Sequence, residues 1–310
     1  MKLISTEHEE LIKQILPDER IDNVREIRAG WNNIVFLVNQ KFIVKIPKSV
    51  SASDGIELEA EILKRIKRNI SVDVPEYFSV LRNSHVSAAA YRYIKGCNMT
   101  TESIDAATCT VNPITEVEAP VLSDLMKQLG SILTSIHSIT GKEIREVISR
   151  HRREPWRDYL SLRIENIRKA AISAFDSLDW ARVKRFLDRI DEVSRSFNFK
   201  DRFIHGDFGG WNILVDIDMG MVTGIIDWAE CRFGDPAWDF MELEYDYGHD
   251  ISALAMDHYG LDIENMDERI ETYLLLSGFL DIEYGLASNS AEYVGRGKKR
   301  VMNDVDAFLR

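Results

Sequence analysis

The spacing of apolar residues in the first third of the chain predicts one short helix followed by a β-rich region. A helical spacing of three to four residues begins the chain and stops at Pro17. The helical spacing returns at residues 54–68 and predicts a second helix. The runs of β-branched and aromatic residues that predict strands are 24–28, 34–39, 42–46, 76–81 and 88–94. We expect the first three strands to form an antiparallel meander.

Beyond Gly96 the apolar pattern becomes mostly helical. The segment 97–119 is polar and lacks periodicity, which predicts a connection between two lobes. Long helices are predicted at 121–139, 155–175 and 180–197, and short strands at 202–204, 213–215 and 222–226. This order predicts an α+β fold with a small β-rich N-terminal lobe at 1–95 and a larger, mostly helical C-terminal lobe at 96–310. A ligand is expected in the cleft between the lobes.

Composition narrows the class of protein. The chain has 310 residues, of which 45% are hydrophobic and 29% are charged, as is typical of a globular protein. No run approaches the ~20 apolar residues of a membrane span, and the first residues are acidic, so we expect a soluble, cytoplasmic protein without a membrane partner. Three cysteines without a C-x-x-C pair favour a reducing compartment.

The acidic balance of the chain bears on its partners. The formal net charge is −12, which disfavours nucleic acid because phosphate backbones select basic surfaces. A cationic small molecule would suit such a protein. The alternative is that the acidic residues only keep the protein soluble.

Two motifs in the second half of the chain are candidates for catalysis. Asp207 and Asn212 lie five residues apart in HGDFGGWN, between two predicted strands. The catalytic loop of protein kinases has the same spacing between the Asp that orients the attacking hydroxyl and the Asn that holds magnesium. Asp227 follows Asn212 by fifteen residues and ends an apolar strand, where kinases carry a second magnesium ligand. Each motif alone also fits a turn or a helix cap, but their joint order indicates phosphoryl transfer.

His205 precedes Asp207 in the same loop. A general base or metal ligand is one role for it, and a structural hydrogen-bonding group is the other. Its place beside a strand end favours the structural role. We expect His205 to brace the loop that aims Asp207.

A lysine and a glutamate in the first lobe form a candidate phosphate-binding pair. Strand alternation puts Lys45 on the same face as Ile43. Kinases place such a lysine on the α- and β-phosphates and pair it with a helix glutamate. At ~100° per residue Glu59 falls on the inward face of the following helix, whereas Glu57 and Glu61 point to solvent. The alternative for Lys45 is an edge-strand lysine that discourages aggregation.

The segment around Gly30 and Asn32 is a candidate phosphate cradle. It has one glycine where protein kinases carry G-x-G-x-x-G, and a plain hairpin turn explains it equally well. No G-x-x-x-x-G-K-[ST] motif is present, which disfavours a P-loop enzyme. We interpret the basic run at 295–300 as a solvated charge patch.

These motifs in this order resemble the aminoglycoside phosphotransferase family, which has a protein-kinase-like bilobal fold and includes macrolide and other small-molecule kinases. The resemblance is specific in HGDFGGWNILVD and GIIDWAECRFGDPAWDF and looser in FIVKIPK, IELEAEILKRI and YRYIKG. It implies that Asp207 is the catalytic base and that Asn212 and Asp227 bind Mg²⁺. It also implies that Lys45 and Glu59 are the strand lysine and the helix glutamate of the nucleotide site.

The resemblance extends to the hinge and to a structural motif. The adenine-binding hinge of the family works through backbone groups and falls between Arg92 and Ile94. Asp235 and Asp239 match a motif that we interpret as structural, with Asp235 as a helix cap, and we expect both to stabilise the loop that carries Asp227, called the metal loop below. At Asn212 the chain departs from several 2''-aminoglycoside and macrolide phosphotransferases, which carry His there.

The sequence therefore predicts transfer of the γ-phosphoryl group of ATP or GTP to a hydroxyl of a small molecule. An aminoglycoside is the first candidate, because acidic residues that could bind ammonium groups follow the metal loop. These residues are Glu242, Glu244, Asp246 and Asp250. Their alternative is an exposed acidic helix face. A macrolide or a cellular metabolite as acceptor, a pseudokinase that only binds nucleotide, and a metal-dependent hydrolase are the alternative functions.

Overall fold

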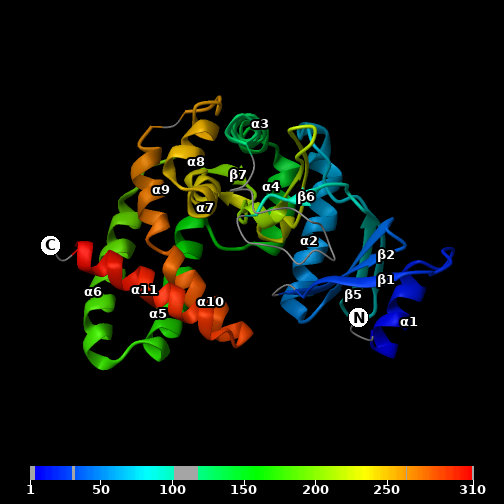
Figure 1. Ribbon diagram of the computed structural model, residues 1–310, viewed down its shortest axis with the longest axis horizontal. Helices are drawn as coiled ribbons and strands as arrows, with labels where there is room; N and C mark the ends of the chain where they lie inside the picture. Colours follow the sequence, from blue (N-terminus) through cyan, green and yellow to red (C-terminus); the bar gives the residue numbers. More distant parts are fainter. Residues whose placement is uncertain (1–3, 30–31, 101–117, 263, 309–310) are drawn as a thin grey trace.

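Two lobes of different secondary structure make up the molecule. The computed structural model describes residues 4–29, 32–100, 118–262 and 264–308. One lobe is built on a β-sheet from the first third of the chain, and the other consists mostly of helices (Figure 1). The predicted α+β fold with two lobes is confirmed. Within the described part of the chain, none of the helices is long and apolar enough to cross a membrane.

The N-terminal sheet has five strands in the order β1-β2-β3-β5-β4, and its neighbours pair antiparallel. Its first three strands form the predicted meander. Helix α1 packs Ile12 and Ile15 against one face of the sheet, and α2 covers the other face. The elements of this lobe are α1 (Thr6–Ile15), β1 (Val24–Ala29), β2 (Asn33–Val38), β3 (Phe42–Pro47), α2 (Val50–Ile66), η1 (Lys67–Asn69), β4 (Tyr77–Arg82) and β5 (Val86–Arg92).

Helix α2 connects the two lobes because two of its faces are apolar. Ile56 and Ala60 pack with the sheet, whereas Leu58 and Ile62 belong to the core of the helical lobe. The helix begins about one turn earlier than predicted, because the side chain of Ser49 accepts a hydrogen bond from a backbone N–H of the first turn. The buried side chain of Glu59 on this helix reaches Lys45 of β3.

The C-terminal lobe surrounds two small sheets with helices. The sheets have the orders β6-β8-β9 and β10-β7. The apolar pattern did not predict α4 or β10. Helix α4 is short and strongly charged, and β10 has only three residues, the first of which is an arginine. The elements are β6 (Cys97–Asn98), α3 (Ala119–His137), α4 (Lys142–His151), α5 (Trp156–Ala174), α6 (Ser177–Ser196), β7 (Arg202–Ile204), η3 (Gly210–Asn212), β8 (Ile213–Asp216), β9 (Met221–Ile225), η4 (Trp228–Glu230), β10 (Arg232–Gly234), α7 (Ala237–Tyr247), α8 (His249–Met256), α9 (Met266–Leu274), α10 (Ser277–Ser288) and α11 (Ala291–Phe308).

Pairing of β8 with β9 brings the two catalytic motifs together. Because these strands run antiparallel, the start of β8 lies beside the end of β9. Asn212 immediately precedes β8, and its carbonyl oxygen accepts a hydrogen bond of 2.9 Å from the N–H of Ile226. Asp227 is the next residue. Two residues fifteen positions apart in the sequence therefore lie at the same edge of this sheet.

Candidate active site

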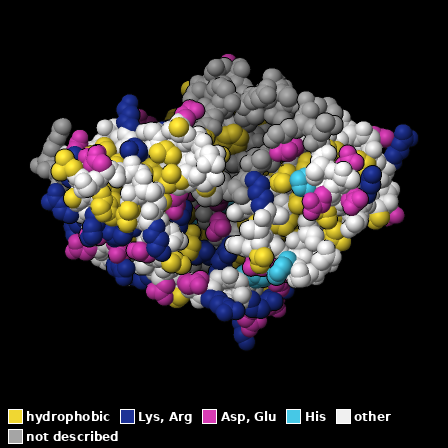
Figure 2. Space-filling model, turned by 90° about the horizontal axis from the view of Figure 1, so that it is seen from below, with side chains coloured by type: hydrophobic (Ala, Val, Ile, Leu, Met, Phe, Trp, Pro, Cys, Tyr) yellow, Lys and Arg dark blue, Asp and Glu magenta, His cyan; other side chains and the backbone are white. Residues whose placement is uncertain are grey.

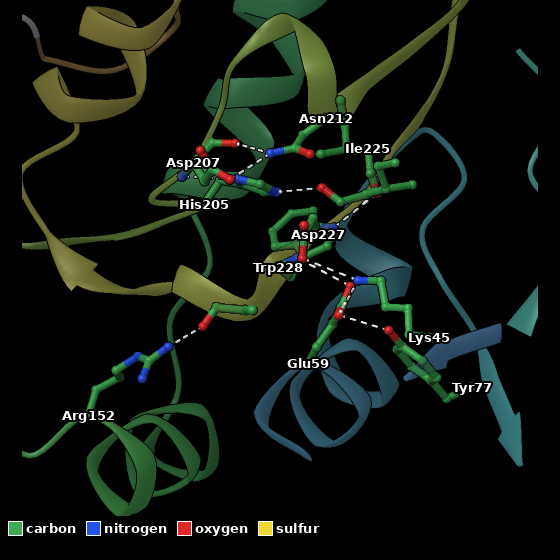
Figure 3. Close-up of polar contacts among 12 residues, drawn as sticks. Lys45, Glu59, Tyr77, Arg152, His205, Asp207, Asn212, Ile225, Asp227 and Trp228 are labelled. Atoms are coloured by element: carbon green, nitrogen blue, oxygen red, sulfur yellow. Dashed lines mark hydrogen bonds and ion pairs between the residues drawn. The ribbon is translucent and has the colours of Figure 1, made fainter. Parts of the chain in front are cut away.

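An ion-pair network centred on Lys45 lies between the lobes. Its Nζ lies 2.9 Å from Glu59 Oε2 and 3.2 Å from Asp227 Oδ1 (Figure 3). The side chains of Lys45 and Glu59 are 5% and 0% exposed, whereas that of Asp227 is 37% exposed. A buried ammonium group is costly unless it is paired, and here two carboxylates pair with it. The predicted Lys45–Glu59 ion pair is present, and Asp227 extends it into the helical lobe.

Glu59 binds two further groups of the site. Its Oε2 also accepts a hydrogen bond of 2.8 Å from the Tyr77 hydroxyl, and its Oε1 accepts one of 3.2 Å from the backbone N–H of Trp228. Burial lowers the pKa of Lys45, but the carboxylates of Asp227 and Glu59 outweigh that effect and raise it well above its ordinary value. Tyr77 was not among the predicted site residues, and only strand alternation offered a signal for it.

The glutamates on either side of Glu59 do point away from Lys45, as predicted. They are not simply solvated, however. Glu57 Oε1 lies 3.2 Å from Arg82 Nε, and Glu61 Oε1 lies 2.6 Å from Arg150 Nη2. Helix geometry predicted the outward direction of both glutamates. It could not predict their partners, because these arginines come from β4 and α4.

Within the catalytic loop, residues 205–212, the side chain of Asn212 holds Asp207 in place. The Asn212 amide nitrogen donates to the backbone oxygen of Asp207 at 2.9 Å and to Asp207 Oδ2 at 2.8 Å. Asn212 itself is buried. Because its amide nitrogen is engaged by Asp207, its Oδ1 is the atom that could contact a cation. The carboxylate of Asp207 is thereby fixed at the end of the loop between β7 and β8.

His205 braces the catalytic loop against the metal loop. Its Nδ1 lies 3.3 Å from the backbone nitrogen of Asp207, and its Nε2 lies 3.2 Å from the carbonyl oxygen of Ile226. Burial lowers the pKa of His205, which favours a neutral ring. A neutral ring that accepts at Nδ1 must donate from Nε2, and these two contacts meet that requirement. The geometry matches the bracing role that the sequence favoured.

Asp239 anchors the backbone of the catalytic loop. This buried carboxylate on α7 accepts hydrogen bonds of 2.8 Å from the N–H groups of both His205 and Gly206, and it contacts His137 Nε2 at 3.1 Å. Gly206 has a φ of 81°, and a Cβ there would lie 2.5 Å from the carbonyl oxygen of Glu230. The expectation that Asp239 supports the metal loop is therefore corrected, because its hydrogen bonds are with the catalytic loop and with His137 of α3.

Asp235, its neighbour in the same motif, has a separate role. Its Oδ1 accepts a hydrogen bond of 3.0 Å from the Ala237 N–H at the start of α7, in agreement with a capping role. Its Oδ2 lies 2.9 Å from Arg269 Nε and accepts a hydrogen bond of 2.9 Å from the Tyr273 hydroxyl. Asp235 therefore fixes α7 to α9 and does not contact the metal loop through these groups.

Replacement of Asp239 by alanine is expected to destabilise the fold by about 3–5 kcal/mol, because it leaves buried donors of the catalytic loop without their carboxylate. Urea unfolding measures this loss. Asp267→Ala, at an exposed acid in the first turn of α9, is the control and should cost less than about 0.5 kcal/mol. A loss below about 1 kcal/mol for Asp239→Ala would contradict the anchoring role.

The metal loop holds Asp227 in an unusual backbone conformation. Asp227 has a φ of 65° and a ψ of 63°, in the left-handed region, which costs a non-glycine residue about 1–2 kcal/mol. Its carboxylate and the Oδ1 of Asn212 are oxygen donors of the type that Mg²⁺ prefers. Among the described residues, no group of three or more His, Cys, Asp or Glu could hold a metal ion. Mg²⁺ commonly uses one or two protein ligands together with substrate phosphates, and this pair of donors fits that pattern.

The acidic residues proposed for the acceptor separate into two sets. Asp246 Oδ2 accepts a hydrogen bond of 2.7 Å from the N–H of Gly210, and Glu242 lies one helical turn before it on the same face of α7. Burial raises the pKa of Glu242, and the charges of Asp207 and Asp246 raise it further. Glu244 lies on another face of α7, with its Oε2 3.4 Å from His249 Nδ1 of α8.

The fourth acid, Asp250, is exposed in the first turn of α8. Only Glu242 and Asp246 are therefore brought to the catalytic loop. Figure 2 shows acidic side chains in the hollow between the two lobes.

The other nucleotide-site candidates lie along the N-terminal lobe. Gly30 lies outside the described residues, and Asn32 is exposed with its carbonyl oxygen accepting from Lys48 N–H at 2.8 Å. Arg92 ends β5 with an exposed side chain. Ile94 is buried against β9, where a Cβ on Gly224 would lie 2.8 Å from Ile94 Cγ2. The hinge segment thus packs directly on the strand that leads to the metal loop.

A comparison with protein families identifies the group to which the chain belongs. The model of the phosphotransferase enzyme family matches residues 23–270. The chain belongs to this family. It is therefore an enzyme of the small-molecule phosphotransferase type, as the motifs predicted in broad terms.

Relatives of this phosphotransferase match it over most of its length. Viomycin phosphotransferase of Streptomyces vinaceus is 20% identical over 274 residues, which cover 87% of this chain and 89% of the relative. The GDP and kanamycin complex of APH(2")-IIia has a TM-score of 0.81 and 18% identity, with 97% of this chain and 98% of that chain covered. Macrolide 2'-phosphotransferase type I has a TM-score of 0.69 and 17% identity, with 97% and 99% covered. The fold is therefore the kinase-like fold of aminoglycoside phosphotransferases.

Proposed function

We propose that this phosphotransferase transfers the γ-phosphoryl group of ATP or GTP to a hydroxyl group of a cationic small molecule, with an aminoglycoside as the first candidate. The contact of Lys45 with both Glu59 and Asp227 carries this proposal. It places a lysine suited to phosphates beside a carboxylate suited to a metal, as phosphoryl transfer requires. The GDP–kanamycin and streptomycin–ATP complexes among the similar structures support the choice of donor and acceptor class.

Each residue of the catalytic loop has a defined part in the proposed reaction. Asp207 orients the acceptor hydroxyl and takes its proton as the oxygen attacks the γ-phosphorus. The bond between the γ-phosphorus and the bridging oxygen breaks, and the nucleoside diphosphate leaves with that electron pair. Asn212 keeps the Asp207 carboxylate in place through its amide hydrogen bond of 2.8 Å. His205 maintains the shape of the loop and does not take part in the proton transfer.

The nucleotide would lie between the hinge and the metal loop. Lys45 would bind the α- and β-phosphates, and Asn212 and Asp227 would hold Mg²⁺. Magnesium, when bound, supplies positive charge that offsets the charge on the phosphates. The backbone between Arg92 and Ile94 would contact the base, and the segment with Gly30 and Asn32 would cover the phosphates.

An acceptor panel tests the proposal. The protein is incubated with MgATP or MgGTP and with aminoglycosides, viomycin, macrolides and amino alcohols, while ADP or GDP formation is followed. Acceptor-dependent diphosphate formation with a cationic acceptor is the expected result. Phosphate release without any acceptor would indicate a hydrolase, and nucleotide binding without turnover across the panel would indicate a pseudokinase.

Glu242 is expected to attract the ammonium groups of the acceptor. Glu242→Gln should raise KM for a cationic acceptor about 10-fold and leave KM for ATP unchanged, because it removes the carboxyl group that would pair with an ammonium group on the acceptor side of the catalytic loop. Glu244→Gln is the matched control, since that side chain contacts α8 instead. Steady-state kinetics measure both variants. An equal rise in KM for the two variants would exclude a specific role of Glu242.

A further inference from the structure

The C-terminal end of α4 contacts the candidate active site at two places, on α2 and on the metal loop. The proposed reaction assigns neither place to the nucleotide or the acceptor. Arg150 and His151 contact α2, and Arg152 contacts the metal loop. These three consecutive residues therefore connect the helix that carries Glu59 to the loop that carries Asp227.

The contact with α2 is made through Glu61. Arg150 Nη2 lies 2.6 Å from Glu61 Oε1, and His151 Nε2 lies 3.6 Å from Glu61 Oε2. Glu61 follows Glu59 by two residues and lies on a different face of α2. Arg150, together with Arg65, also lowers the pKa of Glu61, even though burial acts to raise it, so the carboxylate stays charged. This contact holds α2 from the side opposite to Lys45.

The contact with the metal loop is made to the backbone. Arg152 Nη2 donates a hydrogen bond to the carbonyl oxygen of Ala229 (Figure 3). The nearest carboxylate, Glu230 Oε1, lies 3.7 Å from the same nitrogen, which is beyond hydrogen-bonding distance. Arg152 Nε is buried and has no hydrogen-bond partner among the described residues. The Ala229 carbonyl is therefore the group that orients this guanidinium.

Two backbone anchors hold the metal loop at the two residues that follow Asp227. On the side of the N-terminal lobe, the N–H of Trp228 donates to Glu59 Oε1 at 3.2 Å. On the opposite side, the Ala229 carbonyl accepts from Arg152. Asp227 itself is in the left-handed region at a φ of 65°, a conformation that persists only where the surroundings hold it. Removal of either anchor would let the loop relax.

We infer that Arg152 is a positioning residue for phosphoryl transfer, because it holds the Ala229 carbonyl and thereby fixes the direction of the Asp227 carboxylate. Arg150 supports it by holding α2, and thus Glu59, against the same end of α4. Arg152 does not touch the nucleotide, the metal or the acceptor. The inference rests on the proposed function, since it assumes that Asp227 binds Mg²⁺.

The test separates metal-dependent from metal-independent nucleotide binding. Calorimetry gives the affinity for ATP with and without Mg²⁺, and steady-state kinetics give kcat and KM. Arg152→Met keeps the apolar stem and removes the donors. We expect it to reduce the gain in affinity that Mg²⁺ provides, and kcat, by about 10- to 100-fold, as is typical when a group that orients a metal ligand is lost. Affinity for metal-free ATP should stay unchanged.

Two further variants complete the test. Arg152→Lys keeps a charged donor and should recover activity to within about threefold of the wild type, because the carbonyl needs one donor rather than a fork. Arg153→Met, at the exposed neighbouring arginine, should behave as the wild type. A wild-type gain from Mg²⁺ in Arg152→Met would overturn the inference. So would an equal loss of metal-free and metal-dependent affinity with a lowered Tm, which would make Arg152 a purely structural residue.

The binding measurement needs no acceptor. If the wild type binds MgATP more tightly than ATP but phosphorylates no acceptor, the proposed function fails while the role of Arg152 is still decided. If Mg²⁺ gives the wild type no gain in affinity, the assignment of Asp227 as a metal ligand fails, and the inference fails with it.

Discussion

Replacement of Asp207 by alanine is expected to lower kcat by about 10²- to 10⁴-fold while nucleotide affinity is largely kept, because in the proposed reaction this carboxylate acts on the acceptor hydroxyl and not on the phosphates. The Asp207 Oδ2 accepts a hydrogen bond of 2.8 Å from Asn212, and this contact holds the carboxylate in place. Asp207→Asn keeps the volume of the side chain but cannot take a proton, so it should lose activity to a similar degree. Acceptor-dependent ADP formation measures turnover, and calorimetry measures ATP binding.

Asp218→Ala serves as the control for this experiment. Asp218 lies in the turn between β8 and β9, only a few residues beyond the catalytic loop, and is exposed. Its loss should leave turnover and Tm as in the wild type. Undiminished phosphorylation by Asp207→Ala would rule out this residue as the base. Loss of ATP affinity in Asp207→Ala equal to the loss of turnover would instead indicate that the loop had collapsed.

The periodicity of the sequence was sufficient to predict one half of the site. Alternation along β3 put Lys45 on the face toward α2, and the helical period selected Glu59 over Glu57 and Glu61. Both inferences depend on regular geometry, in which the direction of a side chain follows from its place in the repeat. The pairing of β8 with β9 likewise follows from two short apolar runs separated by a polar turn.

The helical period also separates the acidic candidates on α7. Glu242 and Asp246 are four residues apart and share a face of α7, whereas Glu244 lies between them in sequence and on another face. Only the first two are brought to the catalytic loop in the structure. Their position after the metal loop grouped all of them, because nearness in sequence does not show the direction of a side chain.

Contacts to backbone groups could not be predicted from the sequence. Asp239 binds the N–H groups of His205 and Gly206, and Arg152 binds the carbonyl oxygen of Ala229. Every residue except proline has these backbone groups, so they leave no pattern in the sequence. For Asp239 a family motif indicated a structural role but not its partner. For Arg152 no signal was available, because α4 itself was not predicted.

The charges in the cleft explain why nucleotide and metal should bind together. Lys45 is shared between Glu59 and Asp227, and the carboxylate of Asp207 lies in the same site. A polyphosphate that enters without a cation meets more carboxylates than ammonium groups. Coulomb repulsion between two unit charges about 4 Å apart amounts to about 4 kcal/mol at an effective dielectric constant of about 20. In the proposed function, a divalent cation held by Asp227 would reverse this balance.

Asp227→Ala is therefore expected to abolish the gain in ATP affinity that Mg²⁺ provides and to lower kcat by about 10²- to 10³-fold or more. Affinity for metal-free ATP should stay equal or rise, because one repelling carboxylate is removed and Lys45 keeps its contact with Glu59. Asp227→Gly adds a second readout. It should be as inactive as Asp227→Ala but more stable than that variant by about 1 kcal/mol, since glycine adopts the φ of 65° without strain. Calorimetric titration with and without Mg²⁺, together with urea unfolding, measures these effects, and an unchanged gain from Mg²⁺ in Asp227→Ala would exclude Asp227 as a metal ligand.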